Sequence, residues 1–129
     1  MTVTSITIDL LAFNLRMSTI MSLNHIIKQR QKKNTILKEE AMNEAERLVR
    51  LLKEQFDFET VYIFGSLATG RFRRHSDIDM AVKGMKIEDY FKAYALLIKE
   101  SRFDVDLKPL EDLSKNLKEK IIKEGIKIG

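Results

Sequence analysis

The spacing of apolar residues divides the chain into helical and strand-like segments. From about Ser22 to Phe56, apolar residues recur every three or four positions between Lys, Glu and Arg, which predicts an amphipathic helix. The polar run QRQKKN favours a division of this segment into two helices near Asn34. The apolar stripe consists of Leu37, Ala41, Ala45, Leu48 and Leu52.

Three short runs are typical of strands. Thr60 to Phe64 is β-branched and aromatic, as expected of a buried strand. Asp77 to Val82 and Phe103 to Leu107 alternate, so each predicted strand has an apolar face and a face that carries aspartates.

Two more amphipathic helices are predicted, from Ile87 to Ile98 and from Glu111 to Lys123. A short helix from Leu67 to about Phe72, capped by Ser66, and an edge strand from Ile126 to Ile128 complete the pattern. This order of elements predicts one α/β (α+β) domain, with a small mixed sheet flanked by helices.

Residues 1–20 differ in character from the rest. The run MTVTSITIDLLAF is apolar and β-branched with almost no charge, so a single domain is predicted at residues 21–129, with a helical N-terminal extension. The first twenty residues could be an extra strand or an interface arm. They could equally be disordered, or lie upstream of a true start at Met17 or Met21.

The composition narrows the possible functions. The chain of 129 residues has the length of one domain, and 44% of its residues are hydrophobic. It has no Cys and two His, which excludes a disulfide framework and a thiolate zinc site. Any metal must be held mainly by oxygen, and oxygen ligands favour magnesium, manganese or calcium.

Charge and hydropathy argue against nucleic-acid and membrane partners. The net charge of +4 is located before Leu37, where five basic residues stand against Asp9 alone. The remainder is neutral overall, so direct binding of nucleic acid is not expected. No apolar run is long enough to span a bilayer, and no signal-peptide pattern is present, so a cytoplasmic protein is expected.

Aspartates at alternate positions of two predicted strands suggest a metal site. Asp77 and Asp79 leave the same face of their strand and repel each other unless a cation lies between them. A third carboxylate on a neighbouring strand would complete a triad able to hold two magnesium ions. Asp104 and Asp106 both have the required parity, and Asp106 is preferred because it is more central in its strand.

A Gly-Ser pair follows the first predicted strand. Gly65 and Ser66 stand where the strand turns into a helix, and free backbone amides at such a turn bind phosphate oxygens. Arg71, Arg73 and Arg74 follow, and could bind the outer phosphates of a nucleotide. Each feature is common by itself. The combination of Gly-Ser, ten residues and Asp-x-Asp is expected by chance in about one of several hundred chains this long.

The stretch GSLATGRFRRHSDIDMAV closely resembles the motif of the polymerase-β-like nucleotidyltransferase superfamily, and more narrowly that of its minimal prokaryotic members. The resemblance runs from about Leu37 to the C-terminus, and includes VDL at Val105 to Leu107. It implies the nucleotidyltransferase fold, and contact of Gly65 and Ser66 with a nucleoside triphosphate. It further implies that Asp106 binds metal and activates the acceptor hydroxyl. The magnesium ligands that it implies are Asp77, Asp79 and Asp106.

The resemblance also implies a function. Many minimal members are antitoxins of a HEPN-domain toxin, and some transfer AMP from ATP to a tyrosine of that partner. An Mg²⁺-dependent nucleotidyltransferase of this kind is the leading expectation. Two alternatives stay open: an antitoxin that neutralises its partner by binding alone, and an aminoglycoside-like adenylyltransferase for small molecules, with an acceptor site assembled in a homo-oligomer. No residue specifies the base, so ATP comes from the resemblance.

Overall fold

The computed structural model describes residues 2–129, and the side chains from Leu10 onward. The chain divides into two units, up to Thr35 and from Ile36 to Gly129, which are described separately. In the first unit, every described residue belongs to helix α1 (Thr2–Gln55). Across residues 2–129, no helix combines the length and the apolar content needed to cross a bilayer.

Helix α1 differs from the sequence prediction in two ways. The described part of residues 1–20 is helical, so the expectation of an extra strand there is wrong. The helix also continues through Asn34 without the expected break. Gln, Arg and Lys have high helix propensity, so the polar run QRQKKN contains nothing that ends a helix.

The second unit is built on four strands: β1 (Thr60–Phe64), β2 (Ile78–Lys83), β3 (Val105–Pro109) and β4 (Ile126–Ile128). Their order in the sheet is β3-β2-β1-β4. β1 pairs antiparallel with both β2 and β4, whereas β2 and β3 are parallel. This confirms the predicted mixed sheet and the predicted bounds of its first and last strands.

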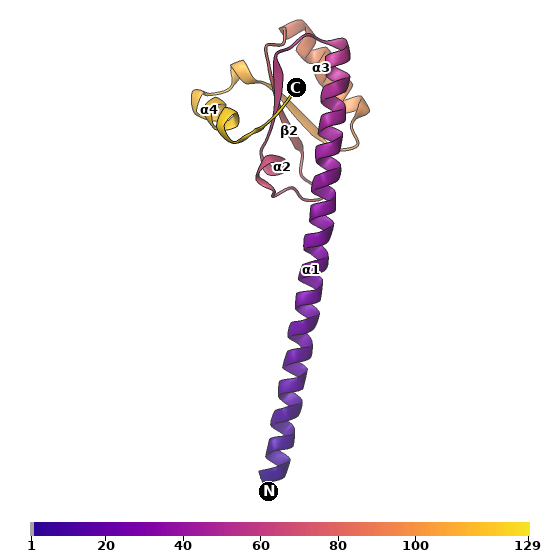
Figure 1. Cartoon of the computed structure of the whole chain (residues 1–129), viewed down its shortest axis with the longest axis vertical. Coiled ribbons are helices and arrows are strands. Elements are labelled where there is room, and N and C mark those ends of the chain that lie inside the picture. The colour runs from indigo at the N-terminus through magenta and orange to yellow at the C-terminus, as the bar shows by residue number, and fades with distance from the viewer. Residues whose placement is uncertain (1) are drawn as a thin grey trace. The chain divides into compact units, whose positions relative to one another are not determined.

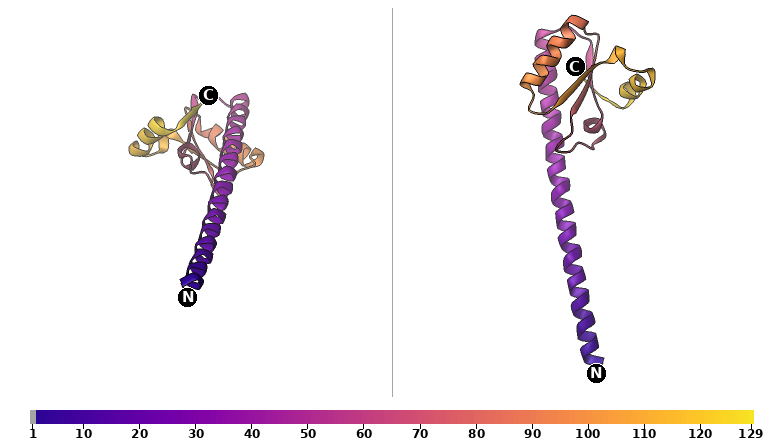
Figure 2. Two further views of the ribbon diagram at one scale, coloured as in Figure 1. Left: turned by 60° about the horizontal axis from the view of Figure 1, so that its bottom comes forward. Right: turned by 180° about the vertical axis from the view of Figure 1, so that it is seen from behind.

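Helices cover both faces of this sheet. The C-terminal part of α1 and helix α3 (Ile87–Glu100) pack on one face, while helix α4 (Lys115–Glu124) and the 3₁₀ helix η1 (Leu110–Asp112) pack on the other. Figures 1 and 2 show α3 beside the last turns of α1, with α4 across the sheet from them. The buried residues of the first core include Leu48, Leu52, Ile78, Met80, Val82 and Leu97, and those of the second are Tyr62, Ala81, Leu110 and Ile121.

Two strands begin later than the sequence predicts. β2 begins at Ile78 rather than Asp77, and β3 at Val105 rather than Phe103. The reason is their mutual pairing, because Ile78 and Val105 are the first register partners of the parallel pair. The alternation predicted for β2 is confirmed, since Ala81 packs in the core opposite to that of its neighbours.

The last helix is also shorter than predicted. It begins at Lys115 rather than Glu111, because the side chain of Ser114 accepts a hydrogen bond from the amide of Leu117 and caps the helix there. The residues before it form η1, which adds Leu110 to the core beneath α4.

Candidate active site

Asp79 and Asp106 lie side by side at the centre of the candidate site. They are direct register partners on the parallel strands β2 and β3, so both side chains leave the same face of the sheet. Asp79 is half-buried, and burial raises the pKa of its carboxyl group. The negative charge of Asp106 raises this pKa further. The site therefore contains two carboxylates whose repulsion a cation would relieve.

Gly65 brings the end of β1 directly against Asp79. A Cβ atom built on Gly65 would overlap Oδ2 of Asp79 and would lie 3.2 Å from its Cγ. Gly65 has φ 67° and ψ −145°, a conformation that residues with side chains rarely adopt. The absence of a side chain at this position therefore allows the turn and the carboxylate to approach each other.

Asp77 and Asp104 lie outside the strands, and both are exposed. The charge of Asp77 is the weakest of the influences on the pKa of Asp79. The carbonyl of Asp104 accepts a hydrogen bond of 2.8 Å from the amide of Ile78, at the start of the β2–β3 pairing. Of the two alternatives for the third carboxylate, Asp106 is thus the one opposite Asp79.

Helix α2 (Ser66–Thr69) starts where β1 ends, with Gly65 as its N-cap residue. Ser66 is the first helical residue and no side chain caps the helix, so the prediction that Ser66 is the cap is wrong. The first-turn amides of a helix have no partner within it, and they can bind an anion. The helix ends before the predicted Phe72, because Gly70 adopts a left-handed conformation with φ 80°.

The loop between α2 and β2 carries Arg71, Arg73 and Arg74, which are all exposed. The guanidinium group of Arg73 donates a hydrogen bond of 3.0 Å to the carbonyl of Phe72. Its backbone amide donates one of 2.9 Å to the hydroxyl of Ser76. The structure thus brings Gly65 together with two aspartates, and leaves the three arginines on the adjoining loop.

Lys108 belongs to the site but was not identified from the sequence. Its ammonium nitrogen lies 2.6 Å from Oδ2 of Asp106 and 5.9 Å from the ring centroid of Phe64. The contact with Asp106 raises the pKa of Lys108. The alternation that puts Asp106 on this face of β3 also puts Lys108 there, since residues two apart on a strand share one face.

Two tyrosines of α3 reach the free edge of β3. The hydroxyl of Tyr90 donates to the carbonyl of Leu107 at 2.6 Å, and that of Tyr94 to the carbonyl of Val105 at 3.3 Å. The Tyr94 hydroxyl also lies 3.5 Å from Oδ1 of Asp106. Because β3 is at the edge of the sheet, these carbonyls face away from β2, and the tyrosines fix the strand that carries Asp106.

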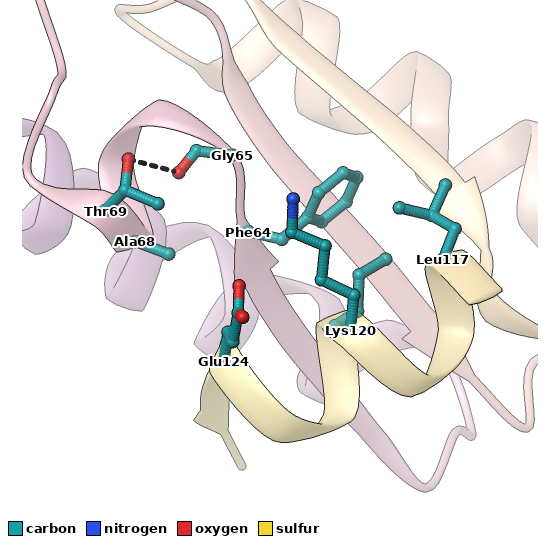
Figure 3. A pocket seen from close by; sticks show the side chains of 9 residues that line it. Phe64, Gly65, Ala68, Thr69, Leu117, Lys120 and Glu124 are labelled. Carbon is teal, nitrogen blue, oxygen red and sulfur yellow. Dashed lines mark hydrogen bonds between the residues drawn. The ribbon is translucent and has the colours of Figure 1, made fainter.

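A cavity of about 240 Å³ adjoins the site between α2 and α4. Figure 3 shows Lys120 and Glu124 of α4 on one side of it, Ala68 and Thr69 of α2 on the other, and Phe64 between them. The hydroxyl of Thr69 donates a hydrogen bond of 3.2 Å to the carbonyl of Gly65, which closes the first turn of α2. Phe64 thus lines this cavity and also lies within 5.9 Å of the Lys108 ammonium nitrogen.

The carboxylates around Asp79 are the candidate ligands for a metal ion. Within residues 2–129 as described, no group of three or more His, Cys, Asp or Glu side chains is arranged to hold one. The Asp79–Asp106 pair nevertheless has the chemistry of a site for a hard cation, because it offers adjacent carboxylate oxygens that repel each other. These two residues would hold such an ion.

This chain is similar to a known protein family and to several solved structures. The profile of the family described as "Polymerase beta, Nucleotidyltransferase" matches residues 46–129. A search of curated proteins gives no match. Among solved structures, a toxin–antitoxin complex with AMP-PNP is 28% identical, with a TM-score of 0.56 over 66% of this chain and 71% of that one.

Two other solved structures have the same degree of similarity. A minimal nucleotidyltransferase is 26% identical, with a TM-score of 0.56 over 69% of this chain and 93% of that one. A tyrosine-to-alanine mutant of the toxin–antitoxin pair MntA-HpeT is 26% identical, with a TM-score of 0.54 over 64% and 69% of the two chains. The predicted nucleotidyltransferase fold is confirmed by this likeness. Since the family profile also spans every residue from Gly65 to Lys108, this chain belongs to the polymerase-β nucleotidyltransferase family.

Proposed function

We propose that this protein is an Mg²⁺-dependent nucleotidyltransferase that transfers AMP from ATP to a tyrosine of a toxin partner. The observation that carries the proposal is the register of Asp79 with Asp106, directly beside the turn at Gly65. It puts two carboxylates next to the amides of a helix start, as metal-assisted phosphoryl transfer requires. Family membership supports the class of reaction, and AMP-PNP in a similar complex supports a nucleotide as substrate.

In this reaction the residues of the chain orient the nucleotide and the acceptor. The first-turn amides of α2 and the hydroxyl of Ser66 bind phosphate oxygens. Asp106 takes the proton of the acceptor hydroxyl, whose oxygen bonds to the α-phosphorus. The bond from that phosphorus to the β-phosphate oxygen breaks, and pyrophosphate leaves.

Magnesium would supply positive charge that offsets the negative charge of the phosphates. The ligands that would hold two such ions are Asp77, Asp79 and Asp106, and the residues that would bind the outer phosphates are Arg71, Arg73 and Arg74.

The proposed partner is a toxin. The toxin–antitoxin complexes among the similar structures support this choice. Within this proposal the toxin has a HEPN domain, a choice that rests on the resemblance of the motif to that of the minimal nucleotidyltransferases. Use of ATP as the substrate would place the reaction in the cytoplasm.

The test is transfer itself. The protein is mixed with Mg²⁺, each labelled nucleoside triphosphate in turn and the product of any neighbouring gene, and the masses of both proteins are measured. One added nucleotide on a partner tyrosine is expected, and it should disappear in Asp77→Asn, Asp79→Asn and Asp106→Asn. Transfer at the wild-type rate in all three variants would refute the metal assignment.

A matched control tests the choice of the third carboxylate. Asp104→Asn removes the same charge two positions from Asp106, but leaves the register pair of aspartates intact. Transfer should persist in this control. If Asp104→Asn abolishes transfer and Asp106→Asn does not, Asp104 rather than Asp106 is the third metal ligand.

An antitoxin that acts by binding alone is the second candidate, and one observation favours it. Lys108 already pairs with Asp106, so this carboxylate has a partner in the absence of a metal ion. In that case no mass is gained, a tight complex forms, and Asp79→Asn still protects cells from the toxin. Transfer to a hydroxyl compound without any protein acceptor would instead identify a small-molecule adenylyltransferase.

A further inference from the structure

Lys108 supplies a positive charge to the pair of carboxylates that would hold the proposed cation. Its ammonium nitrogen is 2.6 Å from Oδ2 of Asp106, the distance of a strong charge-assisted hydrogen bond. Asp106 is in turn the register partner of Asp79, and the charge of Lys108 acts on both carboxylates. One ammonium group therefore offsets the repulsion between two aspartates.

An ammonium group and a divalent cation cannot both occupy this position. The ammonium group of Lys108 takes one acceptor site of Asp106 Oδ2, so a cation that approaches this oxygen meets a positive charge a few ångströms away, which repels it. We propose that Lys108 is a resident counter-ion that competes with the divalent cation for Asp106, and so sets how tightly the site binds that cation. This inference rests on the metal-binding part of the proposed function.

The surroundings of Lys108 allow this exchange. Its side chain is 40% exposed, and its four-carbon stem is flexible, so it can leave Asp106 without disturbing the core. The ring of Phe64 lies 5.9 Å from the ammonium nitrogen, so a cation–π contact accompanies the ion pair with Asp106. After release from Asp106, the ammonium group can keep its contact with this ring.

The test is a titration with Mn²⁺ in the absence of nucleotide, in which electron paramagnetic resonance measures the free ion. Lys108→Gln keeps most of the side chain but removes the competing charge. The dissociation constant for Mn²⁺ should fall by about three- to ten-fold, as expected for one charge a few ångströms away in a partly solvated site. Lys120→Gln is the matched control, because Lys120 lies on α4 near Phe64, at the neighbouring cavity.

Thermal unfolding gives an independent reading of the same competition. In EDTA, Lys108→Gln should melt at a lower temperature than wild type, because the repulsion between Asp79 and Asp106 is no longer offset. Saturating Mn²⁺ should raise its melting temperature by more than it raises that of wild type. Lys120→Gln should behave like wild type in both conditions.

Three results would overturn the proposal: an unchanged or weaker affinity of Lys108→Gln for Mn²⁺, an equal gain in Lys120→Gln, or no binding of Mn²⁺ by any of the three proteins. These outcomes are separable from failure of the proposed transfer reaction. A protein that transfers no nucleotide can still show the competition, and an active transferase can lack it. The titration and the mass measurement thus test different statements.

Discussion

The carboxylate of Asp79 lies so close to the Cα atom of Gly65 that position 65 has no room for a side chain. The positive φ of Gly65, 67°, adds backbone strain to this collision for any other residue. Gly65→Ala is therefore expected to lower the free energy of unfolding by about 2–3 kcal/mol. It should also abolish nucleotide transfer, because Asp79 or the start of α2 must move. Denaturant unfolding and the mass measurement check the two effects.

Gly70 provides the control for this substitution. It has a positive φ of 80°, but a Cβ atom there would meet only the end of the flexible Lys38 side chain, at 3.4 Å. Gly70→Ala should cost about 1 kcal/mol of backbone strain and retain transfer. Equal losses of stability and activity in both variants would show that the collision with Asp79 does not matter.

Asp79 illustrates a conflict between stability and function. Burial and the charge of Asp106 both disfavour its ionised form in the folded protein. Asp79→Asn removes this charge while keeping the size of the side chain. In cation-free buffer at neutral pH, it should raise the free energy of unfolding by about 1 kcal/mol, while it abolishes transfer. A destabilised variant would contradict the inferred repulsion.

The stability that Asp79→Asn gains over wild type should increase with pH. The pKa of Asp79 is raised in the folded protein, so the protonated form stabilises the fold. That contribution is complete below the unfolded-state pKa of about 3.9, and is lost as the pH rises through the folded pKa. The advantage of Asp79→Asn over wild type should therefore be near zero at about pH 3 and grow toward neutrality. If the difference in free energy of unfolding between Asp79→Asn and wild type is the same at every pH, its cause is not the ionisation of Asp79.

Alternation along the strands made the central part of this site predictable. A two-residue period puts Asp79 and Ala81 on the face opposite Met80, and the structure has this arrangement. The choice between Asp104 and Asp106 could not be made from parity, because both satisfy it. The register of β2 with β3 decides which of them faces Asp79, and register depends on contacts between segments far apart in the chain.

The features that the sequence did not reveal depend on tertiary contacts. The role of Gly65 opposite Asp79 is visible only once β1 and β2 are paired. The helix at Ser66 was predicted with the wrong cap, because the glycine before it, rather than the serine, takes the N-cap conformation. The continuity of α1 through Asn34 differs from the prediction because the run QRQKKN, although polar, consists mostly of residues that favour helix.

Glu44 links α1 to the segment before β3. Only 6% of it is exposed, and its carboxylate accepts hydrogen bonds from the Arg47 side chain and from the amide of Arg102, the latter at 2.8 Å. The bond with Arg47 lowers the pKa of Glu44 despite burial. Its contribution to stability is thus present above the unfolded-state pKa of about 4.3, and is lost as the pH falls through the folded pKa.

Glu44→Gln should lower the free energy of unfolding at neutral pH by about 1–3 kcal/mol, because it weakens two hydrogen bonds to a buried carboxylate. The difference from wild type should shrink as the pH falls below about 4. Urea unfolding at several pH values measures both effects. Glu46→Gln is the control, since Glu46 lies exposed on the same helix and should show little change. A pH-independent deficit in Glu44→Gln would mean that packing, rather than charge, explains the loss.

Tyr90 and Tyr94 both donate a hydrogen bond to a carbonyl of β3, and the Tyr94 hydroxyl also contacts the carboxylate of Asp106. Tyr90→Phe removes the shorter hydrogen bond, 2.6 Å, and should lower the free energy of unfolding by about 1 kcal/mol. Tyr94→Phe removes the longer one, 3.3 Å, and should cost less stability. The order should be reversed for transfer, because the Tyr94 hydroxyl lies 3.5 Å from Oδ1 of Asp106, whereas the Tyr90 hydroxyl donates to the backbone carbonyl of Leu107. Rates of transfer and urea unfolding on both variants check this. An equal loss of rate in Tyr90→Phe would show that the tyrosines act through the position of β3 alone, rather than through the carboxylate of Asp106.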